Sequence, residues 1–94
     1  MRGLTVKIQK IGRLCNLTIE PWFPSPAIPT GSTIGTISNP AYRPLSSQMA
    51  VMGSKNGSTA FPFNVYNNGD IESISVSATT NDIVGLACTY ISAS

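Results

Sequence analysis

The segment that decides the fold lies between Gly31 and Ser77, where three stretches follow one another. Thr33-Ile34-Gly35-Thr36-Ile37 is typical of a short strand, and Asn39-Pro40-Ala41-Tyr42-Arg43-Pro44 is a loop stiffened by prolines. The third stretch, Phe63-Asn64-Val65-Tyr66-Asn67-Asn68-Gly69-Asp70-Ile71, reads as a hairpin whose Asn-Gly step favours a type I′ turn. Together they predict an all-β architecture.

Alternation predicts a hairpin before this segment. Apolar and polar residues alternate over Leu4–Lys10 and again over Leu14–Glu20, which is the period of a half-buried strand. Gly12 lies between the two runs and can adopt the positive φ that a tight turn requires.

Four more strands follow from the second half of the chain. The apolar run Met49–Gly53 predicts a fully buried strand, with a turn at Asn56-Gly57 after it. Three alternating runs complete the set: Thr59–Tyr66, Ile71–Ala78 and Val84–Ile91. The apolar positions change parity within Ile71–Ala78, which predicts a β-bulge near Glu72-Ser73. About seven strands without helical periodicity predict a small antiparallel β-sandwich or barrel-like domain.

Length and composition predict one domain over residues 1–94. Only 11% of the residues are charged, against about 25% in typical soluble domains. Such a surface suits a chain that is partly covered in an oligomer. Because a strand begins almost directly after Met1, we expect the chain to be the C-terminal piece of a longer protein.

The charge balance gives no sign of nucleic-acid binding. The net charge is +2, and four of the six Lys and Arg residues lie in the first thirteen positions, as on a solvated hairpin. A nucleic-acid surface would be more basic, with interleaved aromatic residues. No apolar run approaches the roughly 20 residues of a membrane-spanning helix, so we expect no membrane insertion.

Catalytic and metal-binding residue types are scarce. Histidine is absent, so neither a Ser-His nor a Cys-His pair can form. Asp70 and Glu72 could share a face, but an Asp after Asn-Gly is common in turns. Cys15 and Cys88 could form a disulfide or remain buried free thiols, and we favour the thiols. We therefore predict no enzyme, no cofactor and no metal site.

Two pairs of residues are candidates for ligand binding. Trp22 and Phe23 lie in Pro21–Gly31, where four prolines in eleven residues exclude both helix and central strand and predict a rigid loop. Exposed aromatic rings on such a loop could stack on a sugar, whereas the alternative is that Trp22 folds back over the core. Tyr42 and Arg43 form the second pair. Arg43 could bind a phosphate or carboxylate, or it could bond backbone carbonyls while Tyr42 packs beneath the loop.

The order of these motifs resembles a known family. Tyr42-Arg43-Pro44 follows a short strand, and Asn68-Gly69-Asp70-Ile71 precedes a late one. This pattern, over about Leu4 to Ser92, is similar to the C-terminal head domains of phage tail and baseplate proteins. The likeness is greatest to receptor-binding heads of lactococcal siphophages, which infect Gram-positive bacteria.

The resemblance implies a homotrimeric β head, on the virion, that binds host cell-wall saccharide without catalysis. The protein would be made in the bacterial host cytoplasm. Its expected saccharide contacts are Trp22, Phe23, Tyr42 and Arg43, with Asp70 and Asp82 bonding sugar hydroxyls from loop tips. One alternative is a structural baseplate adaptor that docks onto another phage protein. The other is a carbohydrate-binding module of a hydrolase.

Overall fold

The alternating runs form a single sheet of seven strands, all paired antiparallel, in a computed structural model that describes residues 6–24, 27–74 and 76–93. The sheet order is β1-β2-β7-β4-β5-β6-β3, and a short 3₁₀ turn, η1, lies between β3 and β4 in the chain. The elements are β1 (Val6–Ile11), β2 (Leu14–Trp22), β3 (Thr33–Thr36), η1 (Pro40–Tyr42), β4 (Gln48–Lys55), β5 (Thr59–Tyr66), β6 (Asp70–Ser73) and β7 (Val84–Ile91). The predicted all-β, barrel-like class is confirmed.

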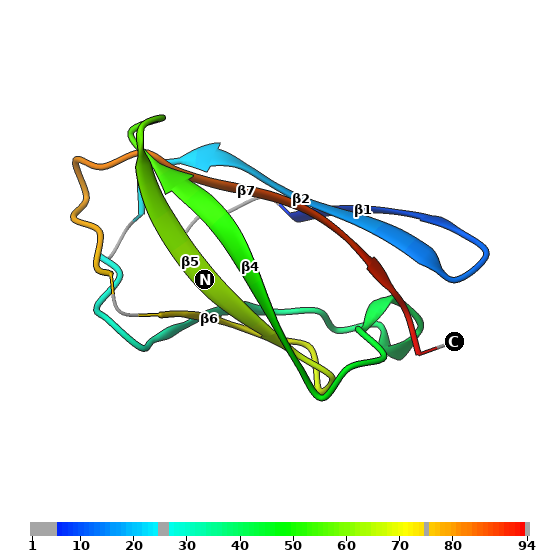
Figure 1. Cartoon of the computed structure of the whole chain (residues 1–94). Helices are drawn as coiled ribbons and strands as arrows, with labels where there is room; N and C mark the ends of the chain where they lie inside the picture. Colours follow the sequence, from blue (N-terminus) through cyan, green and yellow to red (C-terminus); the bar gives the residue numbers. More distant parts are fainter. Residues whose placement is uncertain (1–5, 25–26, 75, 94) are drawn as a thin grey trace.

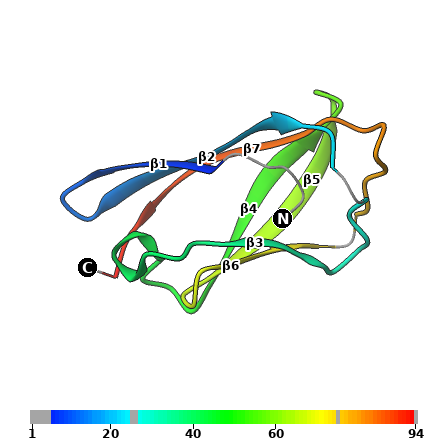
Figure 2. The same ribbon diagram turned by 180° about the vertical axis from the view of Figure 1, so that it is seen from behind.

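The sheet curls into a half-barrel. Strands β1, β2 and β7 form the upper layer in Figure 1, and β4 and β5 cross obliquely from it towards β6 below. Figure 2, seen from behind, shows β3 beside β6 in the lower layer. The two edges of the sheet are therefore β1 and β3, and the core lies inside the curl.

The core takes one face of each long strand, as the alternation predicts. Phe61, Phe63 and Val65 of β5 are buried, and the ring centroids of the two phenylalanines lie 4.9 Å apart. On β2, Cys15, Leu17 and Ile19 are buried between exposed or half-buried neighbours. The other buried apolar residues are Trp22, Ile28, Ile34, Ile37, Ile71, Ala78, Val84, Leu86 and Tyr90.

The turns follow the glycines, but the type I′ geometry lies at a different Asn-Gly step from the one predicted. Asn56 and Gly57 both have positive φ, at 57° and 73°, as a type I′ turn requires. At Asn68-Gly69 only Gly69 has positive φ, at 96°, so the type I′ prediction there is wrong. Because Tyr66 and Asp70 flank a loop of three residues, a turn that ends in a positive-φ glycine fits it better.

Strand β2 continues through Pro21 and Trp22, so the prediction that this proline-rich segment contains no central strand is wrong at its start. The β2–β7 pairing shifts register between Ile19 and Trp22. Pro21 therefore lies at an irregular step of the β2–β7 pairing, where the missing N–H of a proline is tolerated.

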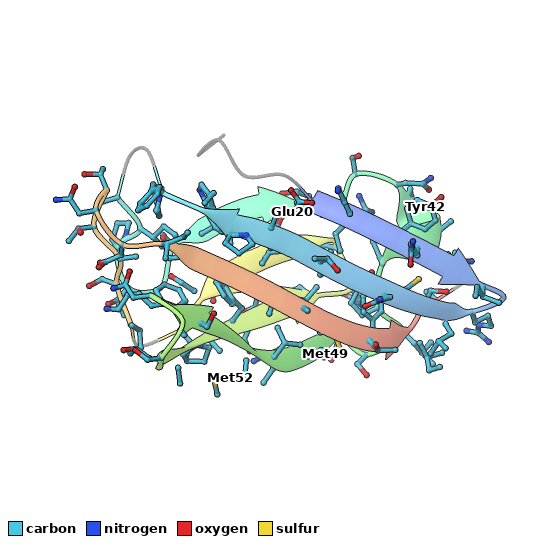
Figure 3. The ribbon with its side chains drawn as sticks, turned by 90° about the horizontal axis from the view of Figure 1, so that it is seen from above. Glu20, Tyr42, Met49 and Met52 are labelled. Carbon is cyan, nitrogen blue, oxygen red and sulfur yellow. The ribbon has the colours of Figure 1, made fainter. Side chains whose placement is uncertain are left out.

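Strand β4 is not fully buried, contrary to prediction. Met49 and Val51 are half-buried on the inner face, opposite Val65 and Phe63, while Met52 is 61% exposed and projects from the outer face (Figure 3). A single curled sheet has one face in solvent, so its strands alternate even where the sequence is continuously apolar.

The strand predicted over Ile71–Ala78 ends at Ser73 as β6. Beyond it, the Ile74 N–H still donates to the Pro62 carbonyl of β5, and Ala78 forms an isolated bridge with Ile28, while Ser75 lies outside the described residues. β6 pairs with β5 without a shift, so the predicted bulge near Glu72-Ser73 is not in that pairing. The irregularity lies instead in β3, between Thr33 and Gly35, opposite Glu72 and Ile71.

Candidate functional site

The open side of the half-barrel holds a pocket of about 280 Å³ between the two edge strands, which we call the slot. Its volume is near the lower end of the roughly 300–1,000 Å³ range of small-molecule pockets. β1 contributes an apolar wall, and β3 with the loop after it contributes hydroxyl, amide and aromatic residues. The lining residues are Val6, Ile8, Thr36, Ile37, Ser38, Asn39 and Tyr42.

Tyr42 is placed in the slot by the 3₁₀ turn η1. Asn39 caps this turn, because its side-chain oxygen accepts from the Ala41 N–H at 3.0 Å, and Pro40 fits the first helical position. The Tyr90 hydroxyl donates to the Tyr42 carbonyl at 2.5 Å. Burial raises the pKa of Tyr90 above its usual value, so this hydroxyl keeps its proton at any physiological pH. The turn is thus anchored to the last strand, and Tyr42 lies beside the β1 edge (Figure 3).

Arg43 fixes the polar wall of the slot from behind. Its Nε donates to the Ile37 carbonyl at 2.9 Å, and its Nη2 donates to the Ser38 carbonyl at 3.1 Å. The sequence left open whether Arg43 binds an anion or backbone carbonyls, and the structure has it on the carbonyls. Arg43 therefore holds the lining segment in place.

Asp70 and Gly69 support the same wall from the β5–β6 turn. The Thr36 hydroxyl donates to Asp70 Oδ1 at 2.9 Å, and the Ile37 N–H donates to the Gly69 carbonyl at 2.7 Å. A Cβ on Gly69 would lie 2.3 Å from the Ile37 oxygen and 2.9 Å from Arg43 Nε. The chain can approach this closely only because residue 69 has no side chain.

The other predicted contacts lie at the opposite end of the sheet. Trp22 pairs with Val84 at the start of β7, whereas Tyr42 is bonded to Tyr90 six residues later, which is about 20 Å along a strand. Trp22 is only 9% exposed and belongs to the core, so the alternative in which it folds back describes its position, while Phe23 is 60% exposed.

Asp82, at this second end, uses its carboxylate to join two loops. Oδ2 accepts from the Thr79 N–H at 2.9 Å, and Oδ1 accepts from the Asn56 side-chain amide at 3.0 Å. The Asn56 oxygen in turn accepts from the Ile83 N–H at 2.9 Å. The Thr79 and Asn56 hydrogen bonds hold the pKa of Asp82 below its usual value. Of the six predicted contacts, the structure thus groups Tyr42, Arg43 and Asp70 at the slot, and Trp22, Phe23 and Asp82 elsewhere.

The cysteines are free thiols, as we favoured. Cys15 is buried, and burial raises the pKa of the half-buried Cys88 to about 11, which makes that thiol a poor nucleophile at neutral pH. Within residues 6–24, 27–74 and 76–93, no three Cys, Asp or Glu side chains group closely enough to hold a metal ion. The described part of the chain also contains no helix long and apolar enough to cross a membrane.

Sequence reasoning missed Thr36, Ser38 and Asn39 as slot residues, along with Val6 and Ile8 across the gap. The Asn39-Pro40 step could have marked a capped turn that presents Tyr42. Nothing in the sequence shows that β1 and β3 are the two edges, because that depends on the order of all seven strands.

A scan against protein-family models finds no match for this chain, and neither does a search of curated proteins. The functional interpretation therefore depends on the geometry of the slot and on the motif resemblance described above.

Proposed function

We propose that this domain binds an uncharged saccharide of a Gram-positive cell wall in the slot, as the trimeric receptor-binding head of a phage tail tip or baseplate. The resemblance of Tyr42-Arg43-Pro44 and Asn68-Gly69-Asp70-Ile71 to phage head domains supports the setting on the virion. In this proposal the domain binds its ligand without catalysing a reaction.

The observation that carries the proposal is the meeting of three sequence candidates at one pocket. Tyr42 lines the slot, Arg43 holds Ile37 and Ser38, and Asp70 orients the Thr36 hydroxyl. An aromatic residue beside hydroxyl and amide groups suits a sugar ring, which has an apolar C–H face and a rim of hydroxyls.

The lining also favours an uncharged ligand over a phosphate-bearing one. Among the described residues, none that lines the slot is Lys, Arg, Asp or Glu, and the nearby guanidinium of Arg43 is turned onto two carbonyls. An anion in the slot would therefore lack the paired N–H donors that usually bind phosphate. A neutral polysaccharide has no need of them.

The test is labelling of Gram-positive cells by the fluorescent domain, clustered beforehand to restore avidity and counted by flow cytometry. We expect strain-selective labelling that the purified neutral cell-wall polysaccharide of that strain competes away. Thr36→Val removes the hydroxyl that Asp70 orients at the slot, and it should weaken labelling about tenfold, as the loss of one polar contact to a ligand does. Its matched control is Thr33→Val on the same strand, outside the lining, which should label as the wild type does.

Equal labelling by both threonine variants would contradict the slot as the site. Failure of the domain to label any strain, including the host of the parent phage, would contradict receptor binding altogether.

The second candidate is a structural adaptor that docks onto another phage protein. It is favoured by exposed apolar residues on the outer face of the sheet, among them Ile11 at 83% and Leu14 and Ile91 at 49% each. A protein partner that binds the domain but not the cell wall would support this alternative.

A further inference from the structure

Four large apolar side chains form a continuous row on the outer face of the sheet, which we call the apolar row. Ile11 pairs with Leu14, and Leu14 pairs with Ile91. Leu45 is next in line, because its N–H donates to the Ile91 carbonyl at 2.9 Å and the adjacent Pro44 and Ser92 form a bridge. Directly paired residues point to the same face, so all four face solvent, each at least 49% exposed.

The apolar row has a basic end. Arg13 lies in the turn between Ile11 and Leu14, where its guanidinium donates to the Ser92 carbonyl at 3.0 Å and to the Ala93 carbonyl at 3.3 Å. Both of these partners are neutral carbonyl oxygens. Further along this face, Lys7 is paired with Glu20 at 2.5 Å.

A second outer face, across β4, β5 and β6, carries the opposite charge, and we call it the acidic face. Gln48, Ala50 and Met52 alternate outward along β4, opposite Tyr66, Asn64 and Pro62 of β5. Asp70 and Glu72 alternate outward on the adjoining β6, and the Tyr66 hydroxyl donates to Glu72 at 2.8 Å. Among the described residues at these alternating positions there are two carboxylates, no cation and the 61% exposed Met52.

The two faces belong to different sides of one molecule. The apolar row belongs to the β1–β2 turn, the end of β7 and the loop bonded to it, at the right of Figure 1, whereas β4 and β5 slope away from the upper layer where β4 joins β7. A contact between the apolar row of one copy and the acidic face of the next would use two different surfaces of each copy. Such head-to-tail contacts close into a ring when the rotation between neighbours permits it.

We propose that copies of this chain associate head to tail, with the apolar row and Arg13 of one copy packed on the acidic face of its neighbour. The opposite charges of Arg13 and of the Asp70 and Glu72 carboxylates favour this contact. Apolar residues at the centre and opposite charges at the margin are the usual composition of a specific interface. The inference builds on the proposed trimer and not on saccharide binding.

The test is the molar mass of the chain in solution, by sedimentation equilibrium, for three variants. Leu14→Asp puts a charge in the apolar row that also repels the acidic face. Ala50→Arg puts a bulky side chain at the centre of the acidic face, beside Asn64. Thr80→Asp, in the exposed loop before β7, adds the same charge as Leu14→Asp but lies on neither surface.

We expect the wild type and Thr80→Asp to be trimers, and Leu14→Asp and Ala50→Arg each to be monomers with unchanged circular dichroism. Mixing the last two should give a one-to-one heterodimer, since each variant keeps the surface that the other has lost. An interface of two identical surfaces cannot give that result.

A monomeric wild type at millimolar concentration would overturn both this inference and the proposed trimer. Two folded variants that remain trimers would overturn the inference and leave the trimer, located elsewhere. Association of Ala50→Arg with itself, or a mixture that stays monomeric at millimolar concentration, would overturn the head-to-tail arrangement.

Discussion

The two ends of the sheet use similar side chains for different purposes. At the end of β7 that holds Tyr90, Asn39 caps a turn, Arg43 bonds two carbonyls and Asp70 orients a hydroxyl, and together they leave a slot. At the start of β7, Asn56 and Asp82 bond each other and the backbone of the facing loop. There the polar atoms hold the β4–β5 turn against the loop before β7, and we call this the closed end.

The difference shows that composition alone does not make a polar cluster a binding site. Asp82 accepts hydrogen bonds through both of its oxygens, from Thr79 and from Asn56. At the slot, by contrast, the supporting residues lie behind the lining and leave a pocket in front of it. A cluster leaves room for a ligand only where its hydrogen bonds are directed away from the pocket. At the slot this depends on which strands form the edges of the sheet.

The largest expected effect is at the slot end, in Gly69→Ala. The new Cβ would lie 2.3 Å from the Ile37 oxygen at a φ of 96°, so the β5–β6 turn must move. We expect a loss of about 3 kcal/mol in the free energy of unfolding, measured with urea, together with loss of saccharide binding. Gly57→Ala is the control, since φ is also positive there but nothing lies within 4 Å, and it should cost about 1 kcal/mol. Equal costs would show that the close approach at Gly69 does not matter.

A second comparison removes one supporting residue from each end. Arg43→Met leaves the Ile37 and Ser38 carbonyls without their donor, and we expect a loss of about 2 kcal/mol in unfolding free energy and at least tenfold in binding. Asn56→Ala removes its bonds to Asp82 and Ile83 and should cost about 1 kcal/mol without changing binding. Calorimetry with the competing polysaccharide distinguishes the two, and weaker binding by Asn56→Ala would break the contrast between the ends.

The strands could be predicted from sequence because each has its own alternation. β1, β2, β5 and β7 lie close to their predicted ranges, with Leu4 and Thr5 of the first range outside the described residues, and the Gly12 turn has the expected positive φ, at 61°. The errors occur where the conformation or burial of a residue depends on the neighbouring strands of the sheet. Pro21 remains in β2 because its partner strand shifts register there, and β4 alternates because one face of the sheet is open.

The candidate site was predictable only in part, for a related reason. Tyr42, Arg43 and Asp70 could be chosen by residue type, and the bonds of Arg43 to carbonyls were among the alternatives considered. Their partners Thr36 and Val6 are ordinary strand residues. They line a pocket only because β1 and β3, at opposite edges of the sheet order, face each other across the open side.

A smaller effect is expected from pH at the closed end. The pKa of Asp82 is held below its usual value of 3.8, so in the folded state the carboxylate is favoured. Its contribution to stability is therefore present above about pH 4 and is lost as the pH falls through the folded-state pKa. Thermal unfolding between pH 6 and about pH 2 should show this loss in the wild type and less of it in Asp82→Asn. Identical pH profiles would mean that the Thr79 and Asn56 bonds do not favour the charged form.

The smallest expected effect tests the comparison most directly. Phe23 is 60% exposed at the closed end, so Phe23→Ser removes little buried surface and should change the unfolding free energy by no more than about 0.5 kcal/mol. If the slot is the binding site, cell labelling by this variant should equal that of the wild type, because Phe23 and Tyr42 lie at opposite ends of β7. Loss of labelling, with stability unchanged, would transfer the saccharide site to the closed end. The Asn56–Asp82 cluster would then be the support of a binding surface around Phe23, and the slot would be only the unfilled gap of a half-barrel.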